Sequence, residues 1–183
     1  MSERHGRAAA LWAVIGTITV LVSGCGIVGA RSPGAPVVDS MTVLSPRFRS
    51  MGELPTEYSC RGEKVNPPLR WSGVPAGAKS LALVVDAVDP HTGGYVHWIV
   101  FDIDPRATEL AEDSVPAGAR QALNTSDDKR YSPPCVAENN YRFTVYALRN
   151  PVGLRDGAPL ARTLERIADE TVARGRLTAS HIE

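Results

Sequence analysis

The sequence predicts a mainly β domain that carries a helix near its C-terminus. Short runs rich in valine, isoleucine, tyrosine and phenylalanine alternate with clusters of glycine, proline and aspartate, which is the pattern of strands joined by turns. Near the end of the chain, the spacing of apolar residues changes to that of a helix. The 183 residues, less a short leader, fit a single domain at about 150 residues per domain.

The predicted strands are four apolar runs, at residues 41–44, 80–85, 96–103 and 141–148. In the last run, tyrosine, phenylalanine, valine and alanine alternate with arginine and threonine, so we expect this strand to bury one face. The run from Tyr95 to Phe101 is apolar on both faces. We therefore expect it in the centre of its sheet, with cover on each side.

The predicted helix begins at Leu160. Apolar and small residues recur at helical spacing from there, at Leu160, Leu164, Ile167, Ala168 and Thr171. This spacing is typical of an amphipathic helix with one face against a core. Pro159 suits the helix start, and Gly175 is expected to end the helix.

The first residues predict an exported lipoprotein precursor. Two arginines precede a charge-free apolar stretch, residues 8–22, which leads to Ser23, Gly24 and Cys25. This is the order of a secretory signal peptide with a small-residue cleavage site. The segment around that site also resembles the lipobox of bacterial lipoproteins, in which the cysteine receives lipid. The alternative is an uncleaved membrane helix, because the charge-free stretch is long enough to cross a bilayer.

These features divide the chain into three expected parts. Residues 1–24 form the signal peptide, residues 25–40 the lipid anchor and a flexible tether rich in glycine and proline, and residues 41–183 the globular domain. The expected partner of Cys25 is the membrane, through lipid on its sulfur. We expect the protein on the cell membrane, lipid-anchored and facing the extracytoplasmic side.

Charge and motifs exclude several functions. The 20 lysines and arginines balance 20 aspartates and glutamates, so nucleic acid is not an expected partner. The sequence lacks a glycine-rich phosphate loop and the HExxH, CxxC and GxSxG motifs. The histidines beyond the leader, His91, His97 and His181, lack the helical spacing of metal ligands. We therefore expect neither a cofactor nor a metal site.

Two cysteines remain after Cys25, at positions 60 and 135. An even pair in an oxidising compartment ordinarily forms a disulfide, so Cys60–Cys135 is a disulfide candidate. Two separate buried thiols are the alternative, because sequence alone does not place the two Cα atoms within about 7 Å.

A polar cluster at residues 86–98 interrupts the apolar sequence. A turn rich in proline and glycine joins two strands there, which would bring Asp89 and His97 to one end of the sheet. A carboxylate could hold the imidazole in one tautomer and leave its other nitrogen for a ligand. The alternative is a satisfied core histidine. A second rigid turn, residues 131–135, carries two prolines and could equally be an ordinary surface loop.

Five segments carry a further signal: residues 58–62, 66–75, 80–86, 96–98 and 143–148. Together they resemble the bacterial Raf-kinase-inhibitor-like branch of the phosphatidylethanolamine-binding protein family, from about residue 44 to about residue 176. The resemblance implies a sandwich of two antiparallel sheets with a few peripheral helices. It also implies a small pocket at one end that accepts phosphate or a phospholipid head group.

The resemblance also implies which residues form the pocket: Asp89, His97, Tyr131, Pro134, Asn139 and Tyr141. The family's Asp-Pro-Asp turn places Ala87 at its first aspartate and Asp89 at its second, unless a one-residue gap gives Asp86 the first position. The family's His-Arg-Tyr segment falls on residues 139–141, where only the tyrosine is kept. Neutral Asn139 removes the charge assistance that strengthens a hydrogen bond to an anion. Neutral or weakly anionic ligands therefore become more plausible than phosphate.

We accordingly expect a membrane-tethered, non-enzymatic binding domain with a small pocket for an anionic or polar head-group-like ligand. Asp89 would orient His97, the two tyrosines would supply hydroxyls, and Pro134 would shape a wall. The alternative function is a cell-surface protein–protein interaction module with a vestigial pocket. A third alternative is a cysteine hydrolase using Cys135 and His97, which a Cys60–Cys135 disulfide would exclude because the nucleophile must be a thiolate.

Overall fold

A computed structural model describes residues 40–89, 93–137 and 139–182, and the side chains of residues 88, 89 and 93 are not described. The predicted signal peptide, Cys25 and all of the tether except Ser40 lie outside the described residues. Within the described part of the chain, no helix is both long and apolar enough to cross a bilayer.

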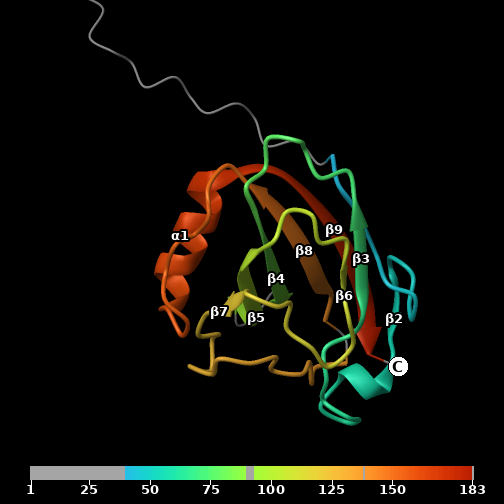
Figure 1. The fold of residues 1–183 in the computed structure, drawn as a ribbon. Helices are drawn as coiled ribbons and strands as arrows, with labels where there is room; N and C mark the ends of the chain where they lie inside the picture. The colour runs from blue at the N-terminus through green and yellow to red at the C-terminus, as the bar shows by residue number, and fades with distance from the viewer. Residues whose placement is uncertain (1–39, 90–92, 138, 183) are drawn as a thin grey trace, which may run out of the picture. The chain divides into compact units, whose positions relative to one another are not determined.

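Two sheets form the domain, as predicted (Figure 1). The larger sheet has six strands in the order β2-β9-β8-β4-β5-β7: Gly52–Leu54, Thr171–Ile182, Tyr141–Leu148, Ser80–Asp89, Gly93–Ile103 and Arg120–Gln121. The smaller sheet has three strands in the order β1-β3-β6: Thr42–Leu44, Leu69–Ser72 and Glu109–Leu110. All pairs are antiparallel except β2 with β9, which is parallel. A short 3-10 helix, η1 (Thr56–Tyr58), follows β2.

The main core lies between the two sheets and joins side chains such as Trp71 from β3 to Val85 and Phe143 from the larger sheet. A second core lies on the opposite face of the larger sheet, where α1 (Leu160–Glu170) packs Ile167 against it (Figure 1). The run from Tyr95 to Phe101 therefore has cover on both faces, as expected. Each fully buried valine or leucine contributes about 1.5–3 kcal/mol, so these two layers supply most of the driving force for folding.

The C-terminal segment differs from the prediction. The helix begins at Leu160, as expected, but ends at Glu170, and the next residues form β9. Gly175 does not end the helix, because it lies inside β9, where a Cβ atom would overlap the backbone of Met41. The inward positions of β9 are mostly small, such as Ala173 and Ala179. Small residues give a weak alternation signal, which is why the sequence did not reveal this strand.

Candidate functional site

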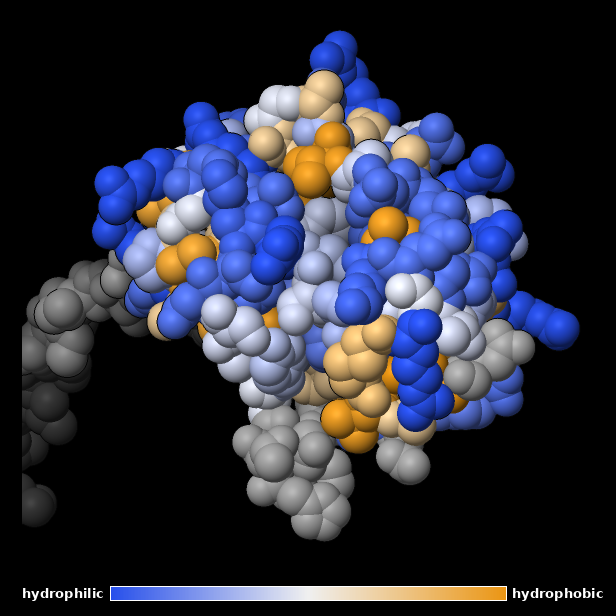
Figure 2. Space-filling view, turned by 90° about the horizontal axis from the view of Figure 1, so that it is seen from below, coloured by the Kyte–Doolittle hydropathy of each residue, from blue (hydrophilic) through white to orange (hydrophobic). Residues whose placement is uncertain are grey.

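A cavity of about 270 Å³ opens at one end of the larger sheet. Residues from the end of β4, the start of β5, the start of β8 and the loop before β8 line it: Ala87, Tyr95, His97, Ser132, Pro133, Cys135, Val136, Asn139 and Tyr141. Figure 2 views the molecule from the side of this loop, where the surface is mainly hydrophilic and hydrophobic residues stand out in small groups. Val136 is one of the exposed large hydrophobic residues of the domain.

His97 reaches the cavity because of a β-bulge. Val85 of β4 pairs with Trp98, whereas the next residue, Asp86, pairs with Val96, so His97 has no direct partner on β4. An extra residue in one strand breaks the alternation of faces and re-aims a side chain. As a result, His97 and Trp98 both face inward between the sheets, and Val96 packs against the second core.

The His97 ring is held by the loop before β8. Its Nδ1 lies 2.8 Å from the Ser132 carbonyl oxygen. Because a carbonyl oxygen only accepts, Nδ1 carries the hydrogen and Nε2 is the ring's acceptor. Burial lowers the pKa of His97, against the raising effects of the Ser132 bond and of the Asp86 charge. The residue is only 7% exposed, which accounts for the dominance of burial.

The two aspartates considered from sequence stand differently in the structure. Asp86 pairs with Arg142 of β8, with its Oδ1 atom 3.0 Å from the Arg142 Nε atom, and it does not line the cavity. Asp89 ends β4 opposite Gly93, and its side chain lies outside the described residues. The described hydrogen bond that fixes the tautomer of His97 is the one to the backbone carbonyl of Ser132.

Aromatic rings form two further walls. The Tyr95 ring centroid lies 4.6 Å from that of His97, and the Tyr141 centroid lies 5.5 Å from it. The Tyr95 hydroxyl is 2.5 Å from the Ser126 hydroxyl, and the Tyr141 hydroxyl donates to the Val136 carbonyl. Both phenols are thus positioned by the loops around the cavity.

Of the predicted pocket residues, His97, Asn139 and Tyr141 line the cavity, whereas Tyr131 and Pro134 do not. The Tyr131 hydroxyl donates to the Tyr58 carbonyl at 2.9 Å, and burial strongly raises the pKa of this phenol. Pro134 is buried, and its carbonyl accepts the Cys60 amide at 2.9 Å. Tyr131 and Pro134 therefore hold the 131–136 loop in place without lining the cavity.

Other lining residues were not predicted: Ala87, Tyr95, Ser132, Pro133 and Val136. Tyr95 could have been found from its spacing, because it stands two residues before His97 on one face of a strand. The three residues from the 131–136 loop could not, because adjacent loop residues point in directions that only the fold sets.

A disulfide joins Cys60 to Cys135, with the two Cα atoms 5.3 Å apart. The predicted pairing is therefore present, and the alternative of two separate thiols is not. The bond fastens the 131–136 loop to the segment after η1. It also excludes the hydrolase alternative in this state, because the Cys135 sulfur is not a thiolate.

The electrostatic character of the cavity is simple. Among the described residues, no lysine, arginine, aspartate or glutamate lines it. Its polar side-chain groups are the His97 imidazole, with Nε2 as acceptor, the half-buried Asn139 amide and the hydroxyls of Tyr95, Ser132 and Tyr141. The described part of the chain also shows no cluster of metal-ligating side chains. The arrangement suits a small polar molecule that donates a hydrogen bond and has some apolar surface.

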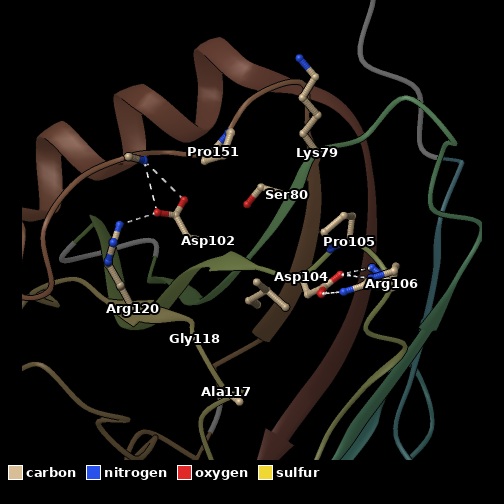
Figure 3. A pocket seen from close by; sticks show the side chains of 12 residues that line it. Lys79, Ser80, Asp102, Asp104, Pro105, Arg106, Ala117, Gly118, Arg120 and Pro151 are labelled. Atoms are coloured by element: carbon tan, nitrogen blue, oxygen red, sulfur yellow. Dashed lines mark hydrogen bonds and ion pairs between the residues drawn. The ribbon is translucent and has the colours of Figure 1, made fainter.

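A larger hollow, of about 680 Å³, lies at the other end of β4 beside Lys79 and Ser80 (Figure 3). Except for Lys79, which bonds to the neutral Asn150 amide oxygen, its charged groups pair with one another. Arg120 lies 2.9 Å from Asp102, and Arg106 lies 2.6 Å from Asp104. These ion pairs leave little unused capacity for a ligand, so the smaller His97 cavity is the better candidate site.

Comparisons with known proteins agree on the family. The family model described as phosphatidylethanolamine-binding protein matches residues 44–182. A Mycobacterium tuberculosis protein named "Putative lipoprotein LppC" is 38% identical over 157 residues, which is 84% of this chain and 77% of that protein. A protein from Methanothermobacter thermautotrophicus, named only as a UPF0098 protein, is 35% identical over 75% of this chain and 95% of its own length.

Two crystal structures share the fold. CT736 of Chlamydia trachomatis, described as a homolog of phosphatidylethanolamine-binding protein, is 33% identical with a TM-score of 0.72. YbcL of Escherichia coli, described as a member of the mammalian family, is 26% identical with a TM-score of 0.73. Each match covers 79% of this chain and 99% of the other.

Proposed function

Because the chain belongs to the phosphatidylethanolamine-binding protein family, we propose that it is a membrane-tethered, non-enzymatic binding domain. Its ligand is a small anionic or polar head-group-like molecule that enters the His97 cavity. The observation that carries this proposal is the buried imidazole, which the β-bulge aims into the cavity with Nε2 as its acceptor. A cavity of about 270 Å³ is close to the lower end of small-molecule sites, so it suits a head group.

Binding rather than catalysis is supported by the described lining. Its sulfur is in a disulfide, and the described Nδ1 contact of His97 is a carbonyl rather than the carboxylate that would support a general base. Activated nucleophiles ordinarily need a base within hydrogen-bond reach, oriented by a third group.

The proposed tether is residues 25–40, with lipid on Cys25, after removal of residues 1–24; residues 41–183 form the binding domain. The order of charged, apolar and small residues before Cys25 supports this. The relative named as a lipoprotein supports it as well. An oxidising location outside the cytosol is consistent with the Cys60–Cys135 disulfide.

Lipidation is tested in bacteria fed radiolabelled palmitate. The wild-type chain should take up label, and the Cys25→Ala variant should not. Equal labelling of the two chains would refute the tether.

The binding site is tested by NMR titration of the histidine rings with ethanolamine phosphate and with inorganic phosphate. We expect saturable shifts of the His97 resonances at millimolar ligand. His181 is the internal control, because it lies on β9 against Glu53 and outside the cavity. In the same spectra, Asp89→Asn should lower the His97 pKa if the Asp89 carboxylate acts on the ring. A His97 signal indifferent to both ligands would favour the protein–protein interaction module instead.

A further inference from the structure

A second hollow lies directly behind the wall of the His97 cavity. It measures about 340 Å³ and is lined by Lys64, Asp128, Arg130, Tyr131, Ser132 and Pro133. Ser132 and Pro133 also line the His97 cavity. The two hollows are therefore neighbours that share one dipeptide as their common wall.

The two hollows differ in charge. Among described residues, the His97 cavity is lined by no charged side chain, whereas the neighbouring hollow carries Lys64 and Arg130. Asp128 offsets one of these cations, because it pairs with Arg130 at 3.2 Å on the exposed surface. One positive charge is left over in the lining, and the Arg130 guanidinium still has donors that Asp128 does not use.

The backbone segments that carry Lys64 and Arg130 are both connected to the His97 cavity. Asn124 is buried, and its Nδ2 donates to the His97 carbonyl at 3.2 Å and to the Arg130 carbonyl at 3.1 Å. Lys64 has a φ angle of 66°, which is uncommon for a lysine, and its amide donates to the Glu57 carbonyl at 3.0 Å. Its loop is joined to the cavity loop by the Cys60–Cys135 disulfide. A frame held in this way loses little freedom when a ligand binds.

The described lining of the His97 cavity is a poor binding site for an anionic group. The Nε2 atom presents a lone pair, which attracts a donor and repels an anionic oxygen. Burying an unpaired charge is costly, whereas lysine and arginine at a partly open site supply charge-assisted hydrogen bonds.

We propose that Lys64 and Arg130 form an anion subsite beside the His97 cavity, so that the ligand is an alcohol or amine carrying a phosphate or carboxylate group. Its hydrogen-bond donor enters the cavity and bonds to Nε2 of His97. Its acidic group lies on the other side of the Ser132–Pro133 wall, where it bonds to Lys64 and Arg130. The proposal rests on the proposed function, because it needs the His97 cavity to bind a ligand, and it adds where the charge of that ligand is held.

The test compares glycerol, inorganic phosphate and glycerol phosphate on the full chain at low salt, by titration of the His97 resonances. Glycerol phosphate should bind about two- to fivefold more tightly than either glycerol or phosphate, since a partly exposed ion pair strengthens binding by no more than about fivefold. Lys64→Gln combined with Arg130→Gln should abolish this advantage and leave glycerol binding unchanged. Glutamine is chosen at position 64 because it keeps a side chain of similar length.

The matched control is Lys79→Gln combined with Arg106→Gln, which removes two cations at the other end of β4 (Figure 3). This control variant should keep the full advantage of glycerol phosphate. An advantage that survives in the Lys64 and Arg130 double variant, or that falls equally in the control, overturns the subsite. Equal binding of glycerol and glycerol phosphate overturns the subsite alone, whereas no His97 response to any probe overturns the proposed function with it.

A vesicle-binding assay distinguishes a lipid head group from a free phosphorylated molecule as the source of the acidic group. Retention on phosphatidylglycerol vesicles that exceeds retention on phosphatidylcholine vesicles, and that needs Lys64 and Arg130, assigns the subsite to a lipid head group. Binding of soluble glycerol phosphate without that vesicle preference assigns it to a free phosphorylated molecule. Both outcomes support the subsite.

Discussion

The two ends of the β4 strand carry hollows of opposite character. At the end near Ala87, a cavity of about 270 Å³ has no charged side chain among its described lining residues, and burial lowers the pKa of its imidazole. At the end near Ser80, a hollow of about 680 Å³ has a lining rich in charge, in which Asp102 and Arg120 already bond to each other. At about 3.3 Å per residue, the two ends are more than 20 Å apart.

The comparison teaches that two hollows of one sheet can differ in how far their polar groups are already bonded to the protein. The carboxylate of Asp102 accepts the Val152 amide at 2.7 Å and the Arg120 guanidinium at 2.9 Å, which fastens the 149–159 loop to the sheet. The Asp102 end of β4 therefore has a structural role, which is to hold this loop against the sheet. At the other end, the Nδ1 atom of the His97 ring bonds to the Ser132 carbonyl, and the Nε2 atom is the acceptor that our proposal assigns to a ligand.

The largest expected effect is loss of the disulfide at the His97 end. Replacing both Cys60 and Cys135 with serine should lower the free energy of unfolding by about 4 kcal/mol, because the bond closes a loop between residues 75 apart in sequence. Urea denaturation measures it, and reduction of the wild-type chain should give a similar loss. The ligand response of His97 should weaken as well, since the loop that carries Ser132 is freed. Unchanged stability in both experiments would contradict this account.

The next effect separates structure from binding. Asp102→Ala should lower the free energy of unfolding by about 2–3 kcal/mol, because it leaves the Val152 amide without its carboxylate and places alanine at a φ of 57°. Ligand binding at His97 should not change. An Asp102→Ala variant of normal stability, or a folded variant that no longer binds ligand at His97, would contradict the assignment of a structural role to one end of β4 and binding to the other.

A smaller effect is the pH dependence that His97 confers. Burial lowers the pKa of His97 in the folded chain, so the unfolded chain binds the proton more tightly. The stabilising contribution is therefore complete above the unfolded pKa of about 6.5 and is lost as the pH falls through the folded pKa. Each unit of difference between the two pKa values corresponds to about 1.36 kcal/mol. Unfolding curves between pH 7.5 and pH 4.5 should show this loss in wild type and less of it in His97→Gln, and parallel curves would contradict it.

The smallest effect is expected at the exposed ion pair of the open hollow. Arg106→Gln removes the partner of Asp104, whose pKa this arginine holds at about 2. The arginine side chain is 88% exposed, so solvent already screens the pair. Thermal unfolding should show no measurable change in midpoint. A clear loss of stability would mean that the open end depends on surface charge as well as on Asp102.

Much of the fold could be predicted from the sequence because it depends on local patterns. Alternating or continuous apolar runs marked β4, β5 and β8, and helical spacing marked the start of α1. The pairing of Cys60 with Cys135 was predicted from their number and from the expected oxidising compartment, with two separate thiols as the alternative. These features need only the period of the side chains, the chemistry of thiols and the length of the chain.

What only the tertiary structure decided is which groups meet at the site. The bulge that turns His97 inward depends on the register between β4 and β5, and a shift of one residue would send the ring to the opposite face. The Ser132 carbonyl reaches that ring because the disulfide and the Tyr131 hydroxyl hold the loop from behind. Likewise β9 forms because the sheet supplies partners for its small residues. Such contacts join residues far apart in the chain, so the local sequence carries no signal for them.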